Sequence, residues 1–404
     1  MTAPHARTIL VATIGITAIV CAADVAPAQM GGWTVTNLHP TGVAMSYGWG
    51  GSGASQVGAA GINFSPLASM WSSTASSWVD LSPPGTTGSV IYHSLGTHQI
   101  GIAQYGVAPF GGPSHATLWN GTAASAIDLN PSSVTVSLAN SLTQSQQGGF
   151  VNPGAGFHAS LWSGTAASWV DLHPAGSTQS VVNTIIDGRQ GGYAVFGGIA
   201  HAGLWSGTQA SWFDLHPAGP TASAVNSISD TQQVGYATVS GRYHAAMWSG
   251  SAGSWVDLNP AGSVESAVHA ITDTLQVGYA NIGGIEFAGL WRGTAASWEV
   301  LPLAVPGSWS NARAQSAWFD SVNVSIVGYG RNNVTGRDEA LLWTRPICRA
   351  DFNHSGGPAP LSAQDIFDFL AAWFAQDPRA DFNSMNGITP QDIFDFLNAW
   401  FVGC

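Results

Sequence analysis

Oxygen-bearing side chains recur near the C-terminus at the spacing of calcium-binding loops. Such loops supply ligands from positions 1, 3, 5, 7, 9 and 12. In the second of two similar sequences, positions 1, 3, 9 and 12 are Asp381, Asn383, Thr389 and Asp392. Met385 at position 5 cannot bind the metal, so Asn386 is expected to supply that oxygen, shifted by one residue.

The first of these loops is longer. Asp351, Asn353 and Ser355 take positions 1, 3 and 5, and Gly356 follows at the turn. The closing Asp365 comes three residues late, so the chain around residues 358–360 must bulge out. The sequence therefore predicts two Ca²⁺ sites, both in irregular loops.

Histidine and aspartate also recur further upstream, at fixed places in a repeat. Four of the twelve histidines stand at the His-Ala position of the repeat and three at its Leu-His-Pro position. Because a catalytic group normally occurs once, these residues are expected to make structural hydrogen bonds, as are the aspartates of Val-Asp-Leu. No nucleophile elbow, His-Glu-x-x-His sequence, P-loop or cysteine cluster is present, and no catalytic residue is assigned.

The repeat itself is marked by a tryptophan that follows leucine or methionine. Its copies stand at positions 71, 119, 162, 205, 248, 291 and 343, and the middle ones are 43 residues apart. Each copy holds four short strand-like runs separated by turn residues, which is typical of a β-propeller blade. These tryptophans are expected to pack between blades. The alternative is a row of exposed rings that stack on sugars.

The ends of the array favour a closed ring. Residues 33–40 match the fourth strand of a repeat, as at residues 212–217, while residues 340–343 match the third strand. Pairing the two would complete a seventh blade and remove free edges. The fold class expected is mainly β: a seven-bladed propeller over residues 29–345, followed by a small helical domain over residues 346–404.

The first 28 residues read as a signal peptide. An apolar run follows Arg7, and Ala26-Pro27-Ala28 forms a small-residue cleavage site. The sequence therefore predicts a secreted, extracellular protein without a membrane span after cleavage. The net charge is −12, and the ten basic residues, all arginine, form no basic stripe that could neutralise phosphates. Nucleic acid is therefore not expected as a partner.

The last 59 residues contain two copies of Gln-Asp-Ile-Phe-Asp-Phe-Leu. Ile366, Phe369, Leu370 and Trp373 form one helical stripe, and the second copy repeats it. The two stripes are expected to bury each other. Such a small core needs further support, which metal and a Cys348–Cys404 disulfide would provide. Two separate thiols, or a Cys404 kept for another bond, are the alternatives.

Two resemblances follow from these motifs. Residues 32–345 resemble extracellular HAF repeats, because four copies carry His-Ala ahead of Leu-Trp or Met-Trp, with later Asp-Leu and runs such as Gln-Val-Gly-Tyr-Ala. This resemblance implies an exported propeller. Leu67, Phe287 and Glu339 depart from the pattern by replacing its histidine. Residues 348–404 resemble a GC-type dockerin, because two calcium loop–helix units end in Gly403-Cys404. This resemblance implies calcium binding and a cohesin-like or cell-surface docking partner.

The function expected from the sequence is a non-catalytic binding or structural protein, held at the cell surface by its tail. The alternative is an extracellular carbohydrate-active enzyme for polysaccharide degradation, with its site at the centre of the propeller and carbohydrate as its ligand. A purely architectural protein of the envelope is a third hypothesis. Acidic residues that converge on one face without repeating would favour the enzyme.

Overall fold

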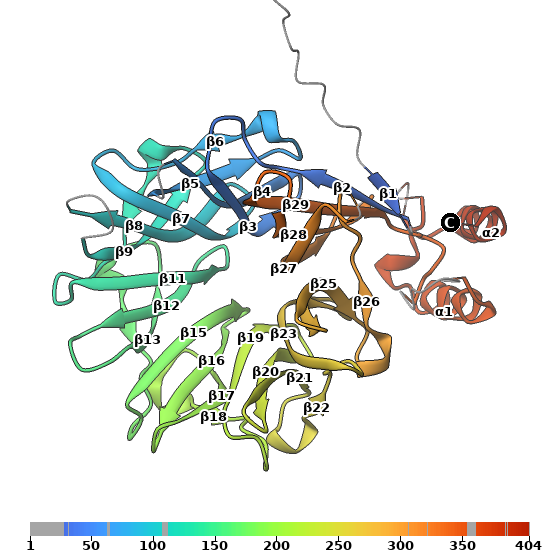
Figure 1. Ribbon diagram of the computed structural model, residues 1–404. Coiled ribbons are helices and arrows are strands. Elements are labelled where there is room, and N and C mark those ends of the chain that lie inside the picture. Colours follow the sequence, from blue (N-terminus) through green and yellow to red (C-terminus); the bar gives the residue numbers. More distant parts are fainter. Residues whose placement is uncertain are drawn as a thin grey trace, which may run out of the picture.

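A computed structural model describes residues 28–30, 32–62, 65–106, 112–305, 307–320, 322–353, 361–383, 385 and 387–403. Within these residues the chain forms seven antiparallel sheets arranged as the blades of a ring (Figure 1). The first strand of each blade contacts the first strands of both neighbouring blades, and β27 contacts β3. The first strands therefore form the inner wall of a closed ring, which confirms the predicted seven-bladed propeller.

The strands are short and follow the same order in every blade. The first strands are β3 (Met45–Ser52), β7 (Thr86–Leu95), β11 (Val136–Leu142), β15 (Gln179–Ile186), β19 (Ser223–Ile228), β23 (Ser263–Thr272) and β27 (Trp309–Phe319). The second strands are β4 (Ser55–Ile62), β8 (His98–Tyr105), β12 (Gln147–Asn152), β16 (Arg189–Phe196), β20 (Gln233–Val239), β24 (Leu275–Ile282) and β28 (Asn323–Asn332).

The third and fourth strands lie further out. The third strands are β5 (Ser65–Trp71), β9 (Ser114–Asn120), β13 (His158–Trp162), β17 (Ile199–Trp205), β21 (Arg242–Trp248), β25 (Ile285–Trp291) and β29 (Arg337–Pro346). The fourth strands are β6 (Val79–Asp80), β10 (Ile127–Asp128), β14 (Val170–Asp171), β18 (Phe213–Asp214), β22 (Val256–Asp257) and β26 (Glu299–Val300), with β2 (Trp33–Asn37) in the last blade. One-turn 3-10 helices precede six of them, at Ala75–Ser77, Ala123–Ser125, Ala166–Ser168, Gln209–Ser211, Ala252–Ser254 and Ala295–Ser297.

The ring closes by pairing the two ends of the array. β2 runs antiparallel to β29, with Thr34 opposite Thr344 and Asn37 opposite Leu341. β1 (Ala28–Met30) adds a further strand outside β2. The predicted closure is therefore confirmed, and it brings the first and last blades into contact.

Each first strand carries a β-bulge, and this explains the recurring Gly-Tyr of the second strand. In β15 the register shifts between Val182 and Thr184, which leaves Asn183 as the extra residue. A Cβ atom added to Gly192 on β16 would lie 1.9 Å from the carbonyl oxygen of Val181, so only glycine fits there. The seven bulged residues on the inner wall are Trp49, Tyr92, Asn140, Asn183, Asn226, His269 and Gln315.

The repeated tryptophans fill the space between blades, as predicted. The tryptophan side chains of all seven Leu-Trp and Met-Trp pairs are at most 1% exposed. Several also donate their indole N–H to a backbone carbonyl of the preceding blade, for example Trp205 to Leu172 at 2.9 Å. Large buried rings stabilise each interface through their area, so the alternative of exposed, sugar-stacking rings at these positions is wrong.

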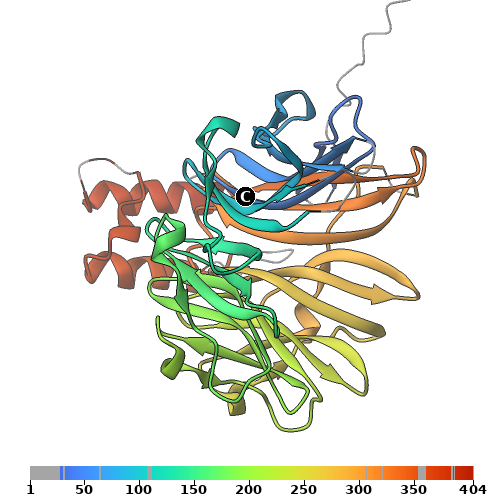
Figure 2. The ribbon, with the colours of Figure 1, turned by 90° about the vertical axis from the view of Figure 1, so that its left-hand side faces the viewer.

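Two helices, α1 (Ala363–Phe374) and α2 (Pro390–Val402), lie outside the ring next to one another (Figures 1 and 2). A 3-10 turn, η7 (Pro378–Ala380), connects them. Phe369 and Phe396 are fully buried, and their rings stack with centroids 4.1 Å apart. The two predicted apolar stripes therefore bury each other. No helix among the described residues is long and apolar enough to cross a membrane.

Candidate functional site

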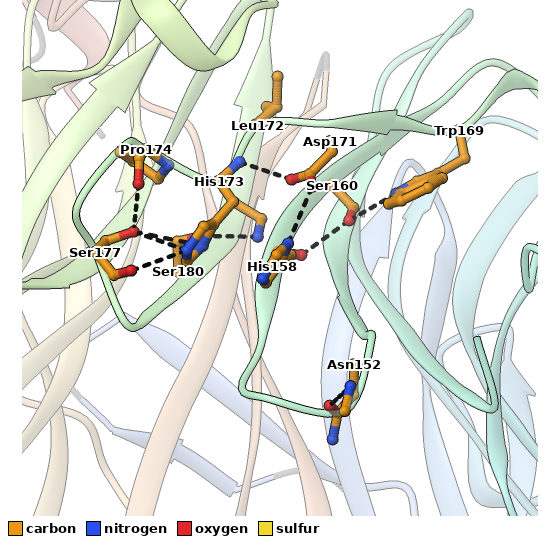
Figure 3. A network of polar contacts seen from close by, with 12 residues as sticks. Asn152, His158, Ser160, Trp169, Asp171, Leu172, His173, Pro174, Ser177 and Ser180 are labelled. Carbon is orange, nitrogen blue, oxygen red and sulfur yellow. Dashed lines mark hydrogen bonds and ion pairs between the residues drawn. The ribbon is translucent and has the colours of Figure 1, made fainter. Parts of the chain in front are cut away.

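The histidines of the His-Ala pairs each contact an aspartate on the neighbouring fourth strand. His158 Nδ1 lies 3.0 Å from Asp171 Oδ2 (Figure 3). The same pair occurs in three further blades: His115 with Asp128, His201 with Asp214 and His244 with Asp257, at 2.7–2.8 Å. In each case the second carboxylate oxygen accepts a backbone N–H two residues on, as from His173 to Asp171. These pairs tie the two outer strands of a blade together.

A second repeated contact joins adjacent blades through a buried serine. Ser180 Oγ accepts the backbone N–H of Ala159 at 2.9 Å and lies 2.8 Å from His173 Nδ1. The ring of His173 stacks on that of His158, with centroids 3.8 Å apart (Figure 3). Burial, and then the proximity of His158, lower the pKa of His173, which favours the neutral form of this ring.

Serine, histidine and aspartate thus meet here, but they cannot act as a catalytic triad. Ser180 is 0% exposed, and its oxygen is already used by a backbone amide. The same serine contact recurs at six of the seven blade interfaces. The serine and the alanine N–H that it accepts are Ser46 and Ala340, Ser89 and Ala68, Ser137 and Ala116, Ser180 and Ala159, Ser223 and Ala202, and Ser266 and Ala245. We call this contact the serine bridge, and it supports the structural role predicted from the repeats.

A cluster that does not repeat lies over the last and first blades. Tyr47 on β3 donates its hydroxyl to Asp338 Oδ2 on β29 at 2.9 Å. Arg331 Nη1 lies 3.4 Å from the other oxygen of the same carboxylate. The side chains of Asp338 and Arg331 are 33% and 46% exposed, so solvent and ligands can reach them. The pKa of Tyr47 is raised, first by burial and then by Asp338, so this hydroxyl stays protonated.

A second charged pair extends the cluster into the sixth blade. Blades are numbered along the chain, so that blade 1 holds β3–β6, blade 6 holds β23–β26 and blade 7 holds β27–β29 with β2. Arg313 on β27 binds Glu286 on β25 through two hydrogen bonds of 2.6 and 2.5 Å. The guanidinium also lies over the ring of Tyr279, 4.1 Å from its centroid. Burial raises the pKa of Tyr329; Arg313 acts against this shift, and Glu286 and Asp338 add to it.

Aromatic rings surround these charged groups. Tyr329 packs edge-on against Tyr47 at 4.9 Å and against Trp49 at 5.8 Å, and Trp49 contacts Tyr92 at 6.2 Å. Trp49 and Tyr92 are the bulged residues of the first two blades, so they line the inner wall where three other blades carry asparagine. We call the whole set the blade 6–7–1 cluster: Tyr47, Trp49, Tyr92, Tyr279, Glu286, Arg313, Tyr329, Arg331 and Asp338.

The strand directions place this cluster at one end of the central channel. Glu286 and Asp338 stand near the starts of third strands, and Arg331 near the end of a second strand. In an antiparallel blade these positions lie at the same end, together with the beginning of the first strand. The acids and arginines of the cluster therefore lie at one end of the ring, on one side of a channel mouth.

Sequence reasoning missed this cluster, because it treated the glutamates as being at unrelated phases of the repeat. Glu286 does join the cluster, whereas two other glutamates serve the ring closure. Glu299 contacts Arg345 and the indole N–H of Trp33. Glu339 accepts the side-chain amide of Asn37 at 2.7 Å. The signal that could have found the cluster is the set of residues that break the repeat, since Tyr47, Arg313 and Asp338 have no counterpart in the middle blades.

The predicted calcium ligands that the structure describes lie together in each loop of the helical module. Asp392 and Asp365 are fully buried, and each accepts the N–H of the residue at position 3 of its loop: Asn383 at 3.1 Å and Asn353 at 3.3 Å. Asp381 Oδ1 and Asn383 Oδ1 both accept the N–H of Met385. Ser355 and Asn386 lie outside the described residues.

Carboxylate and amide oxygens are the ligands that a hard cation such as Ca²⁺ prefers, and here they accept backbone N–H groups of their own loops. A further contact closes each loop, because Asp392 also accepts the N–H and hydroxyl of Thr389. The described residues contain no group of three or more His, Cys, Asp or Glu side chains placed to hold a metal. The calcium sites, with Asp351 as the first ligand of loop one, therefore stay a prediction.

Cys348 takes part in a disulfide bond. Its predicted partner, Cys404, lies outside the described residues, as does nearly all of the predicted signal peptide. The pairing and the cleavage site stay predictions. So does the identity of the module, since two helices alone do not establish a dockerin domain.

Comparison with known proteins gives the fold. No family model matches the chain, and no curated protein does. Among solved structures, puromycin hydrolase is similar with a TM-score of 0.50 and 10% identity, over 74% of this chain and 57% of that one. A puromycin-hydrolyzing peptidase of Mycobacterium tuberculosis gives 0.49, with 12% identity over 75% and 57%. An oligogalacturonate lyase of Vibrio parahaemolyticus gives 0.46, with 10% identity over 79% and 95%.

These comparisons correct the expected function. The sequence led us to expect a non-catalytic binding or structural protein and not an enzyme, and this prediction is contradicted by the puromycin hydrolases among the solved structures that match the propeller. This chain spans 57% of the length of the puromycin hydrolases. At 10% identity the likeness is one of fold, and the reaction must be argued from the site.

Proposed function

We propose that this protein is an extracellular carbohydrate-active enzyme that cleaves glycosidic bonds at the channel mouth formed by blades 6, 7 and 1. The observation that carries the proposal is the Tyr47–Asp338 pair. It combines an accessible carboxylate with a neighbouring protonated hydroxyl at a place where the sevenfold pattern is broken. Glycosidic bond cleavage typically uses carboxylates that exchange a proton with the leaving oxygen or with water.

The neighbours of this pair suit a sugar chain. Trp49, Tyr92 and Tyr329 are half-buried rings in mutual contact, and such rings can pack on the apolar faces of sugars. Arg331 can donate hydrogen bonds to hydroxyl or carboxylate groups of the substrate. In the proposed hydrolysis a water molecule adds to the anomeric carbon as the bond to the glycosidic oxygen breaks. Asp338 takes a proton from this water and gives it to the leaving oxygen, and Tyr47 orients its carboxylate.

Glu286 and Arg313 have a different proposed role. Their two short hydrogen bonds hold both side chains in fixed positions, and Glu286 keeps its guanidinium partner oriented over Tyr279. A fixed pair of this kind positions a substrate more readily than it exchanges protons, because each charge already has its partner. We therefore assign substrate positioning to Glu286 and Arg313.

The experiment is a screen of the full mature chain on neutral and acidic polysaccharides, with release of reducing ends as the readout. Asp338→Asn should lower the rate by at least 100-fold, as expected when a general acid–base group is lost. Asp171→Asn, in a repeated structural pair, is the matched control and should retain the rate. The absence of cleavage across the panel, or equal rates for both variants, would refute the proposal.

For the C-terminal module we propose that it binds Ca²⁺ in both loops and docks the enzyme onto a cohesin-like partner or the cell surface. The oxygens of Asp381, Asn383 and Asp392, which hydrogen bonds link within one loop, support the metal part. The docking part is supported by an exposed apolar surface repeated on both helices: Phe367, Phe374, Phe394 and Phe401 are 64–76% exposed. Export through the predicted signal peptide belongs to the same proposal.

This second proposal is tested by calorimetric titration of the full mature chain with Ca²⁺. Saturable binding of two ions is the expected result. Binding of a cohesin-like partner should then require Ca²⁺ and should weaken at least tenfold in Phe374→Ser. A titration without heat of binding would refute the metal sites.

A further inference from the structure

One blade interface lacks the serine bridge that joins the others. Between blades 6 and 7 the serine position is occupied by Ala312. Its partner position, which is histidine, asparagine or serine at the other interfaces, is occupied by Pro302. The His–Asp pair of blade 6 is also replaced, by Phe287 and Val300. Three additional residues lengthen the connection that leads into β27 compared with the other blades. Four polar positions have thus become apolar at this interface.

A small cavity lies at the same interface. Its volume is about 80 Å³, and its walls are mainly apolar side chains of β25, β27 and the chain between them. The lining residues used below are Glu286, Ala288, Leu301, Leu303, Trp309 and Ala312. A cavity of roughly 150 Å³ holds benzene, so this one has room for a group of about three or four heavy atoms.

The backbone N–H of Ala288 is a hydrogen-bond donor in the wall of this cavity. At the six other interfaces the equivalent alanine donates its N–H to the serine, as Ala202 does to Ser223 at 2.9 Å. Ala288 has the same pairing register, opposite Tyr279, so its N–H is directed at residue 312. Ala312 offers no side-chain acceptor. Among the described residues no side chain accepts the N–H of Ala288, and a buried donor without a partner costs about 1–3 kcal/mol.

We propose that this cavity is a subsite for an acetyl group carried by the carbohydrate substrate. The inference rests on the proposed function and adds a substrate class to it. An acetyl group has three heavy atoms, one carbonyl acceptor and one methyl group. Its carbonyl oxygen would accept the N–H of Ala288, while its methyl group would contact Leu301, Leu303 and Trp309.

The position of the cavity agrees with this assignment. Glu286 both lines the cavity and binds Arg313 of the blade 6–7–1 cluster. Asn311, at the register shift of β27, accepts the N–H of Glu286 at 3.1 Å, which fixes the cavity wall to that ion pair. A sugar bound at the channel mouth can therefore extend a substituent between blades 6 and 7. A bare hydroxyl would leave the apolar walls unfilled, which is the basis of selectivity for the acetylated form.

The test uses Ala312→Ser, which restores the residue found at the six other interfaces and places its hydroxyl on the N–H of Ala288. Ala312→Gly, which keeps the cavity open, is the matched control. Binding of acetylated xylo-oligosaccharides and of the same oligosaccharides after deacetylation is measured by calorimetry with the full chain. The unmodified protein should prefer the acetylated form at least tenfold, Ala312→Ser should lose this preference, and Ala312→Gly should keep it.

A second measurement does not depend on carbohydrate cleavage. Acetamide, a small molecule with the same carbonyl and methyl groups, is titrated while the NMR signal of the Ala288 amide is followed. A saturable shift that disappears in Ala312→Ser is expected, and its absence in the unmodified protein would overturn the subsite. If both oligosaccharides bind equally, the subsite fails while the proposed function stands. If neither binds nor is cleaved but acetamide does shift the signal, the proposed function fails and the acetyl-binding cavity remains.

Discussion

The serine bridge allows one stability prediction to be worked out in detail. Ser180→Ala removes a hydroxyl that is 0% exposed and joins two blades. The change leaves the buried N–H of Ala159 without an acceptor and removes the contact to His173 Nδ1. An unsatisfied buried donor costs about 1–3 kcal/mol, and loss of a net favourable hydrogen bond costs roughly 1 kcal/mol more. We therefore expect the free energy of unfolding to fall by about 2–4 kcal/mol.

The assay is urea unfolding at pH 7, followed by tryptophan fluorescence. The protein has 18 tryptophans, and the seven between the blades report directly on loss of the ring. The control is Ser163→Ala at an exposed position, which should change stability by no more than about 0.5 kcal/mol. If Ser180→Ala behaves like this control, the serine bridge does not stabilise the ring and the argument for a missing bridge between blades 6 and 7 is refuted as well.

Three further predictions concern other parts of the molecule. Burial lowers the pKa of His269 to about 4 from 6.5. As the pH drops from about 6.5 to 4 the unfolded chain takes up a proton before the folded protein does, so the free energy of unfolding falls. His269→Asn should reduce this acid sensitivity in urea unfolding measured at pH 7, 5.5 and 4. Asparagine stands at the same bulge in three other blades, so the variant should fold at pH 7, and an unchanged pH profile would contradict the assignment. Asp392→Asn should weaken Ca²⁺ binding at least tenfold in calorimetry while helix content by circular dichroism is retained, and unaltered binding would exclude this ligand. Reduction of the Cys348 disulfide should destabilise the helical module by about 2–4 kcal/mol in urea unfolding, whereas a Cys348→Ser variant should not respond to reductant.

The propeller fold could be predicted because the sequence contains seven copies of the same repeat. Each blade repeats the same tryptophan, glycine and turn residues, so an error in one copy is corrected by the others. The phase difference between residues 33–40 and 340–343 also predicted the closing pair of strands. Helix positions in the module followed from an apolar stripe at helical spacing, which the stacked Phe369 and Phe396 confirm.

The candidate site could not be predicted in the same way. Tyr47 and Asp338 are 291 residues apart in sequence and become neighbours only because the ring closes between the last and first blades. The repeats identify the structural residues of the blades, whereas residues that occur once, such as Tyr47 and Asp338, carry no pattern in the sequence. This is why the sequence favoured a non-catalytic protein, an expectation that the matching hydrolase structures contradict.

The sequence by itself determined the repeating unit, the number of blades and the two amphipathic helices, since these depend on local spacing of apolar residues and turns. Only the tertiary structure decided which polar residues are used up in holding the ring together and which remain available. The His–Asp pairs and the serines satisfy buried backbone groups within and between blades, whereas Asp338 and Arg331 stay partly exposed at the channel mouth. That distinction depends on contacts across blades, and the spacing along the chain does not contain it.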